Sequence, residues 1–190
     1  MALSKTQTHT VETFERFCAL PENQERNFEL IDGEIVEKNM PTDEHSLIAG
    51  LIIHYLASYC LEHGLGLPGP ERRFSVPGDY KNARMPDVSV ILDPDLPITT
   101  KGAMSQVPDV IVEVKSPDDS NDDLRDRMRF YSANGARLGW LIFPREKIIE
   151  VYRPNVPSEI LTLTDSLDGF DVLPGFSLPV ATLLISKRSG

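Results

Sequence analysis

The stretch Val-Ile-Val-Glu-Val-Lys-Ser-Pro at residues 110–117 constrains this chain more than any other segment. In a strand, alternate side chains point to opposite faces, so Glu113 and Lys115 share one face, and Val112 and Val114 share the other. A carboxylate and an ammonium at the end of an otherwise buried strand are costly to desolvate. Chemistry can offset that cost, because a carboxylate can hold a divalent cation while a lysine steers or deprotonates an attacking water.

A second acidic residue on a neighbouring strand would complete such a site. The dipeptide Pro-Asp occurs four times, at Asp87, Asp95, Asp109 and Asp118. Asp109 lies four residues before Glu113 on the same strand, roughly 13 Å away, which is too far to share one cation. Asp118 follows the strand and Asp95 lies in a loop, whereas Asp87 begins a separate apolar strand. We therefore predict that Asp87 lies beside Glu113.

Two carboxylates and one backbone carbonyl suffice for Mg²⁺ or Mn²⁺, which take oxygen ligands and keep several waters. The predicted metal ligands are Asp87, Glu113 and the carbonyl of Val114. The cation would polarise a phosphate and lower the pKa of a bound water, and Lys115 would stabilise the developing charge or orient the nucleophile. The alternative is that Glu113 and Lys115 form a strand-end ion pair near solvent, which contributes little to stability.

The periodicity of apolar residues predicts a mixed α/β layer fold. Helices are expected at residues 11–20, at 44–63 between a Thr42 or Asp43 N-cap and Gly64, at 121–134, and in a short segment near residue 178. A hairpin is expected at 27–38 around Asp32-Gly33, and further strands at 65–67, 72–76, 88–92, 110–114, 138–143 and 148–152. The 190 residues fit a single domain, with 1–26 as an N-terminal helical extension.

Charge and cysteine content limit the classes of protein. The net charge of −10 argues against tight, non-specific DNA binding by a monomer, because such proteins usually carry a basic footprint. Cys18 and Cys60 are interpreted as small core residues of a reducing cytoplasm rather than as a disulfide. Residues 1–10 lack the apolar core of a signal peptide, and no run is long enough to span a membrane. We expect a cytoplasmic protein.

As an ordered set, several segments resemble the Uma-two family of restriction-endonuclease-like proteins, from about Phe28 to Leu184. These segments are FELIDGE at 28–34, Glu44-His45, Met85-Pro86-Asp87, PDVIVEVKSP at 108–117, YSANG at 131–135, GWLI at 139–142 and LPGF at 173–176. The resemblance implies the PD-(D/E)xK nuclease fold, a restriction-endonuclease-like core in which helices flank a central mixed β-sheet.

The same resemblance assigns roles to individual residues. It implies that Asp87 and Glu113 are the metal-binding carboxylates and that Lys115 is the lysine of the motif. It implies that Arg127 stands where many relatives carry a lysine. Arginine cannot act as a base, but it can hold phosphate. His45 corresponds to a recurrent histidine, either hydrogen-bonded to a site carboxylate or simply exposed at a helix start.

Other charged residues have two interpretations each. Glu44 could supply an extra acidic ligand or only favour the helix dipole. Glu29 and Glu34 could reach the site, although exposed hairpin charges are the default expectation. A basic strip for nucleic acid would use Arg72, Arg73, Arg125 and Arg129, but acidic residues interleave with the last two, as on an ordinary helix surface.

The leading functional hypothesis is a Mg²⁺-dependent endonuclease that hydrolyses nucleic-acid phosphodiester bonds. The alternative is a catalytically silent module on a nuclease fold that acts as a homodimeric interaction protein. A toxin-like or mobile-element-associated nuclease is neither supported nor excluded by the sequence. A homodimer is expected for the endonuclease, since cutting both strands of a duplex needs two sites, and it is part of the alternative hypothesis.

Overall fold

The computed structural model describes residues 8–184, which form two compact units. The first, here called the hairpin unit, contains residues 8–40, 72–85 and 98–107. The second, here called the sheet unit, contains residues 41–71, 86–97 and 108–184. Most of the polar N-terminal segment considered above, residues 1–7, lies outside the described residues. The expectation of one domain over residues 1–190 stays a prediction.

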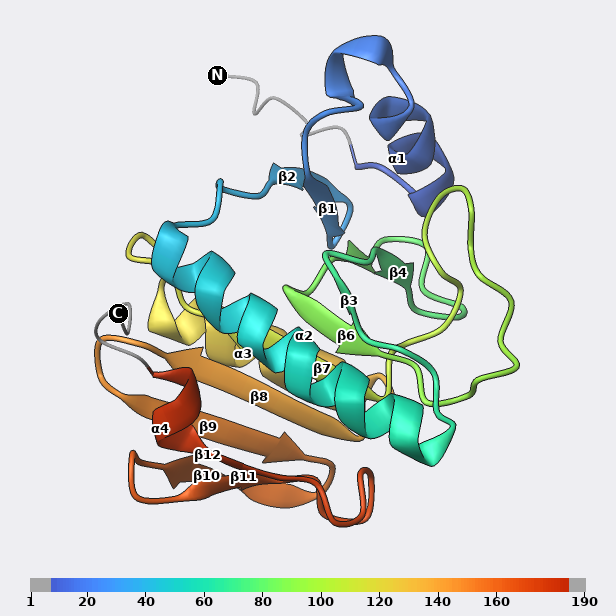
Figure 1. Ribbon diagram of the computed structural model, residues 1–190. Coiled ribbons are helices and arrows are strands. Elements are labelled where there is room, and N and C mark those ends of the chain that lie inside the picture. Colours follow the sequence, from blue (N-terminus) through green and yellow to red (C-terminus); the bar gives the residue numbers. More distant parts are fainter. Residues whose placement is uncertain (1–7, 185–190) are drawn as a thin grey trace. The chain divides into compact units, whose positions relative to one another are not determined.

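A six-stranded mixed sheet forms the centre of the sheet unit (Figure 1). The strand order is β10-β9-β8-β7-β6-β3, and only the β7–β8 pair is parallel. The strands are β3 (Gly69–Pro70), β6 (Val88–Val90), β7 (Val110–Val114), β8 (Leu138–Phe143), β9 (Ile148–Arg153) and β10 (Val156–Leu161). This sheet confirms the expected fold class.

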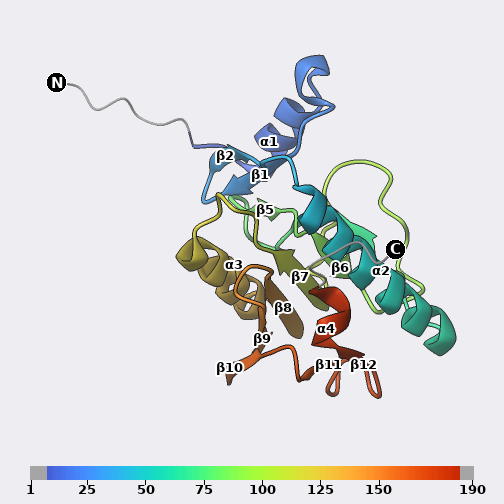
Figure 2. The same ribbon diagram turned by 60° about the vertical axis from the view of Figure 1, so that its left-hand side comes forward.

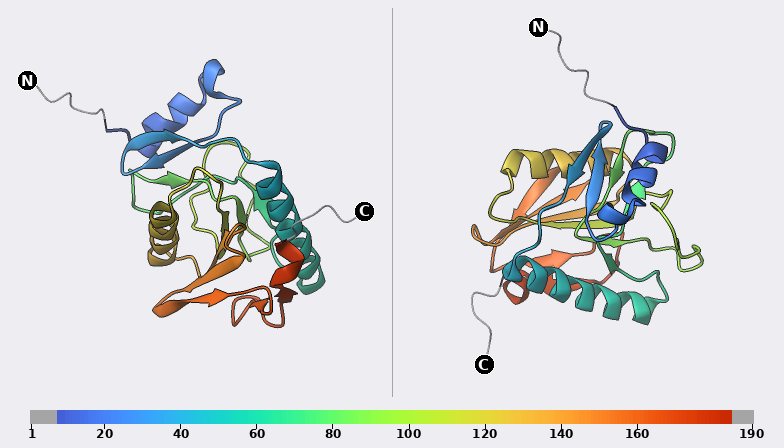
Figure 3. Two further views of the ribbon diagram at one scale, coloured as in Figure 1. Left: turned by 90° about the vertical axis from the view of Figure 1, so that its left-hand side faces the viewer. Right: turned by 90° about the horizontal axis from the view of Figure 1, so that it is seen from above.

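Helices cover both faces of this sheet, as Figures 2 and 3 show. Helix α2 (Asp43–His63) and the short α4 (Val180–Leu183) lie on one face, and α3 (Asn121–Ala133) lies on the other. A small ladder of β11 (Ser166–Asp168) and β12 (Ser177–Pro179) precedes α4. The three layers place Val112 and Val114 toward α2, and Glu113 toward α3.

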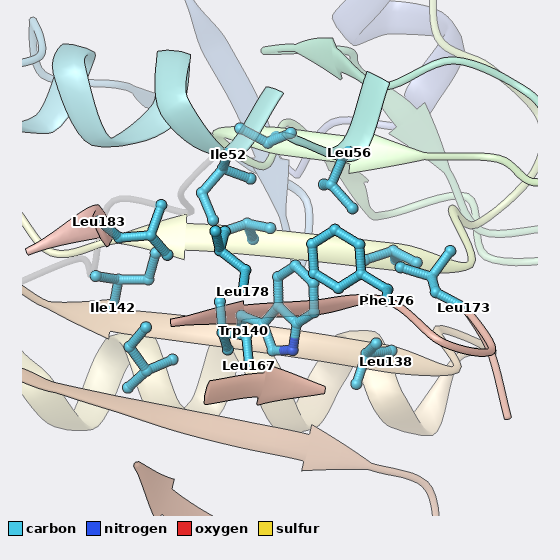
Figure 4. Packing of buried hydrophobic residues seen from close by; sticks show 14 of the residues in the cluster. Ile52, Leu56, Leu138, Trp140, Ile142, Leu167, Leu173, Phe176, Leu178 and Leu183 are labelled. Carbon is cyan, nitrogen blue, oxygen red and sulfur yellow. The ribbon is translucent and has the colours of Figure 1, made fainter. Parts of the chain in front are cut away.

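The core on the α2 face surrounds the single tryptophan (Figure 4). Trp140 is fully buried and stacks on Phe176, with 5.6 Å between ring centroids. Ile52 and Leu56 of α2 approach it from above in this view, and Leu178 comes from β12. The expectation that Trp140 is a core residue is confirmed.

Local signals define the ends of the two long helices of the sheet unit. Thr42 caps α2 by accepting from the N–H of His45, and Gly64 ends it with a left-handed φ of 64°. Ser120 caps α3 by accepting from the N–H of Asp123. These caps agree with the predicted boundaries, because capping depends on neighbouring residues alone.

The hairpin unit has its own four-stranded sheet, with strand order β2-β1-β5-β4. Its elements are α1 (Val11–Cys18), the 3₁₀ turn Pro21–Asn23, β1 (Phe28–Ile31), β2 (Glu34–Glu37), β4 (Phe74–Ser75) and β5 (Ala83–Arg84). The turn at Asp32-Gly33 occurs as predicted. Phe14 of α1 packs with Phe28 and Leu30, so the helix contributes to the core of this unit.

Several details differ from the expectations. No strand forms at residues 65–67, where Gly66 instead donates to the carbonyl of Leu92. The strand predicted at 72–76 is reduced to β4, and the terminal helix begins at Val180.

Both cysteines are free, as expected. Within residues 8–184, no helix is long and apolar enough to cross a membrane.

Candidate metal and catalytic site

The site is built where β6 begins and β7 ends. The two strands pair antiparallel, with Val88 opposite Val112. Asp87, one residue before β6, therefore stands opposite Glu113, one residue further along β7. The predicted adjacency of these two strands is confirmed, and it brings two acidic residues to one place in the sheet unit.

The carboxylate of Asp87 is buried, with 6% of the residue exposed. Its Oδ2 accepts a hydrogen bond from the Val114 N–H at 2.8 Å and lies 2.9 Å from Nε2 of His45. His45 stands in the first turn of α2, where the helix dipole favours negative charge. His45 was predicted either to bond a site carboxylate or to be exposed at the helix start, and the structure shows the first arrangement.

Helix α3 supplies the partners of Glu113, which is only 2% exposed. The hydroxyl of Tyr131 donates to Oε1 at 2.7 Å, and the guanidinium of Arg127 lies 3.5 Å from the same oxygen. Residues four apart lie on one face of a helix, so a single turn of α3 directs both groups to Glu113. The sequence analysis missed Tyr131 as a site residue, although its spacing from Arg127 carried the signal.

Lys115 follows β7 and is partly exposed. Its backbone N–H donates to the carbonyl of Ile142 at 2.9 Å, which extends the ladder to β8. Its side chain lines a small pocket with the exposed Glu44 of α2 and with Ser116, Pro117, Pro144, Arg145 and Glu146. Glu44 and the partly exposed Lys115 therefore line the same pocket.

The oxygen donors at this strand end suit a small hard cation. The N–H and C=O of one strand residue point the same way, so the Val114 carbonyl is directed to the side of β7 where Asp87 lies. Two carboxylates with one carbonyl are enough for Mg²⁺, which keeps waters and takes substrate phosphate oxygens. Among residues 8–184, no three His, Cys, Asp or Glu side chains cluster to hold a metal ion. The chain would thus supply only part of the coordination shell.

A second buried carboxylate, that of Glu150, lies on the same face of the sheet as Glu113. Arg125 of α3 binds both oxygens of Glu150, with its closest contact at 2.6 Å, and Tyr152 donates to Glu150 at 2.7 Å. Burial raises the pKa of Glu150, but these hydrogen bonds outweigh burial and hold the pKa below its usual value. Burial and the contact with Glu150 raise the pKa of Tyr152.

The four arginines predicted to bind nucleic acid have varied surroundings. Arg125 is occupied by Glu150, and Arg129 forms an ion pair with Asp126. In the hairpin unit, Arg73 lies 3.7 Å from Glu15 and stacks over the Phe14 ring, while burial lowers the pKa of Arg72. Their proposed contact with nucleic acid stays a prediction.

The burial of Glu29 in the hairpin unit differs from the expectation. This residue was expected to be exposed on its hairpin, but it is fully buried and its Oε1 accepts from the Met85 N–H at 2.7 Å. The alternation of β1 places Glu29 on the opposite face from Phe28 and Leu30. The pairing of β1 with β5, Leu30 opposite Ala83, brings the Met85 N–H that follows β5 to Glu29. Glu34 is exposed, as expected.

The mixed sheet, its flanking helices and the acidic residues on two adjacent strands define an α/β protein of nuclease-like fold. The family model of Uma2, described as "Putative restriction endonuclease", matches residues 11–181. The chain belongs to this family, as the motif resemblance predicted. None of the curated proteins compared with the chain matches it.

A solved structure agrees with this assignment. The chain is similar to a crystal structure described as a putative nuclease belonging to DUF820 from Anabaena variabilis. The two are 26% identical with a TM-score of 0.78, and the match covers 92% of this chain and 97% of the other. The likeness extends over nearly all of both chains.

Proposed function

We propose that this chain is a Mg²⁺- or Mn²⁺-dependent endonuclease that hydrolyses nucleic-acid phosphodiester bonds with a PD-(D/E)xK site. The observation that carries the proposal is the placement of Asp87 opposite Glu113, joined by the hydrogen bond from the Val114 N–H to Asp87. Membership of a family described as restriction endonucleases supports a nucleic acid as the substrate.

In this proposal, different residues of the chain bind the cation and act on the phosphate. Asp87, Glu113 and the Val114 carbonyl hold the cation, which when bound polarises the phosphate and lowers the pKa of a water. Lys115 reaches the reacting phosphate from the solvent side, where its ammonium stabilises developing negative charge or orients the nucleophile.

Two further residues support those groups in the same proposal. His45 keeps the Asp87 carboxylate in place from the start of α2. Arg127, next to Glu113, is positioned to hold a phosphate oxygen. Glu44 and the arginines Arg72, Arg73, Arg125 and Arg129 are proposed as accessory groups only.

A cleavage assay tests this assignment. Plasmid DNA, single-stranded DNA and RNA would each be incubated with the wild-type protein, with Mg²⁺, with Mn²⁺ or with a chelator. We expect metal-dependent cleavage of one class of nucleic acid. Activity should fall at least about 100-fold in Asp87→Asn, which loses a ligand of the cation, and in Lys115→Met, which loses the ammonium at the reacting phosphate. The exposed Asp95→Asn, from another Pro-Asp pair, is the matched control. Full activity in Asp87→Asn would exclude the proposed site.

A second candidate function, a catalytically silent homodimeric interaction module, is favoured by the surface of α2. Residues 45–61 contain no Asp, Glu, Lys or Arg, although the chain is rich in charge. Leu47 is 40% exposed and Leu61 is 69% exposed. Exposed apolar side chains on a helix surface that lacks charged residues favour a protein partner, and a second copy could cover α2 without charge repulsion.

Sedimentation separates the two functions. A dimer that Leu61→Glu converts to a monomer, together with no turnover on any nucleic acid, would favour the interaction module. A dimer with metal-dependent turnover would fit an endonuclease that cuts both strands of a duplex.

A further inference from the structure

Two buried carboxylates stand in one row across the sheet beneath α3. Glu113 of β7 is in register with Leu141 of β8, and Leu141 is in register with Glu150 of β9. Residues in register on neighbouring strands project to the same face of a sheet. Glu113 and Glu150 are 2% and 4% exposed, so both carboxylates need donors from the protein.

Each of these carboxylates is contacted by an arginine and a tyrosine. At Glu150, Arg125 contacts Oε1 and Oε2, and Tyr152 donates to Oε2. At Glu113, the hydroxyl of Tyr131 donates to Oε1, and Arg127 lies 3.5 Å from the same oxygen. A hydrogen bond to a carboxylate oxygen restricts the rotation of the carboxylate, so the Tyr131 hydroxyl helps to define the orientation of Glu113.

We infer that Tyr131 is a positioning residue for Glu113, whose hydrogen bond to Oε1 fixes the rotation of the carboxylate toward the cation. This inference rests on the proposed function, since it assigns the support of the proposed metal ligand. Carboxylates that bind metals are commonly held by such hydrogen bonds, and removing one typically weakens metal binding 10- to 100-fold.

The surroundings of Tyr131 suit this role. The residue is 1% exposed, and it lies in the last turn of α3. Its backbone carbonyl accepts from the N–H groups of Asn134 and Ala136, which anchors the end of the helix. A phenol held this rigidly loses little conformational entropy when it donates to Glu113.

The test compares Tyr131→Phe with Tyr152→Phe in the full-length protein. Both changes delete one hydroxyl that donates to a buried glutamate at 2.7 Å on the same face of the sheet. Binding of Mn²⁺ alone would be measured by calorimetry, and thermal unfolding would be followed on the same samples. Glu113→Gln would serve as the reference for a lost ligand.

We expect Tyr131→Phe to raise the Kd for Mn²⁺ by at least about tenfold, while Tyr152→Phe stays within twofold of the wild type, although both unfold at lower temperature. A wild-type Kd in Tyr131→Phe, with binding lost in Glu113→Gln, would overturn the inference and leave the proposed metal site standing. Equal weakening in both tyrosine variants would also overturn it, because the effect would then be a general loss of stability. Wild-type protein that binds no Mn²⁺ would overturn both this inference and the metal site.

Discussion

The side-chain carboxylate of Asp87 accepts a hydrogen bond from the backbone N–H of Val114, the residue between Glu113 and Lys115 in the sequence. This contact joins the start of β6 to the end of β7 beyond the last paired residues of their ladder. It places the acidic residue of one strand at the charged end of the other. The geometry of the site thus depends on a side chain as well as on the sheet.

Removing the Asp87 carboxylate should destabilise the protein as well as inactivate it. In Asp87→Ala the Val114 N–H and the His45 ring lose a buried acceptor, so we expect a cost of about 1–3 kcal/mol in the free energy of unfolding. Asp95→Ala, at an exposed loop position, should change it by less than about 0.5 kcal/mol. Urea denaturation measures both. Equal stabilities of the two variants would show that the contacts of Asp87 contribute nothing.

The Arg125–Glu150 pair should make stability depend on pH in the acid range. Because the pKa of Glu150 is lower in the folded state, its contribution is present above its unfolded value of 4.5 and is lost as the pH falls through the folded pKa. Glu150→Gln lacks this contribution. Below pH 4.5, the free energy of unfolding of Glu150→Gln should fall less steeply with decreasing pH than that of the wild type. The two slopes should differ by at most about 1.4 kcal/mol per pH unit. Unfolding curves at several pH values test this, and parallel slopes would contradict it.

Trp140 should tolerate Phe far better than Ala. The indole is fully buried, and among the described residues its Nε1 has no hydrogen-bond partner, so Trp140→Phe removes an unsatisfied donor along with some volume. We expect Trp140→Ala to cost about 3–5 kcal/mol and Trp140→Phe about 1 kcal/mol. Thermal unfolding followed by circular dichroism would compare them. A Phe variant as unstable as the Ala variant would indicate a partner for the indole N–H.

Two glycines should respond in opposite ways to alanine. A Cβ at Gly50, inside α2, would meet no atom within 4 Å, so Gly50→Ala should stabilise the protein by about 0.5–1 kcal/mol through helix propensity. A Cβ at Gly66 would lie 2.1 Å from the carbonyl oxygen of Ile91, so Gly66→Ala forces the backbone apart. We expect a loss of at least about 2 kcal/mol there. Chemical denaturation tests the pair, and a neutral Gly66→Ala would contradict the close packing.

Sequence patterns alone determined the features that depend on neighbouring residues. Apolar periodicity predicted the helices of the sheet unit, and Thr42 and Gly64 predicted the ends of α2, because helix ends need donors or special backbone angles within a few positions. Alternation predicted β7 and the placement of Glu113 on the face opposite Val112 and Val114. Only Asp87 among the four Pro-Asp pairs preceded a separate strand, so its place beside Glu113 could be predicted.

Tertiary structure decided the features that depend on distant partners. Glu29 was expected to be an exposed hairpin charge, but it is buried and accepts from the Met85 N–H just after β5. Arg125 was one of the arginines predicted for a basic strip, and the structure pairs it with Glu150, two strands from Glu113. The hydroxyl of Tyr131 reaches Glu113 because α3 packs on this face of the sheet, chiefly over β8 and β9. A buried charge takes whichever partner the packing brings within reach, and local sequence does not contain that partner.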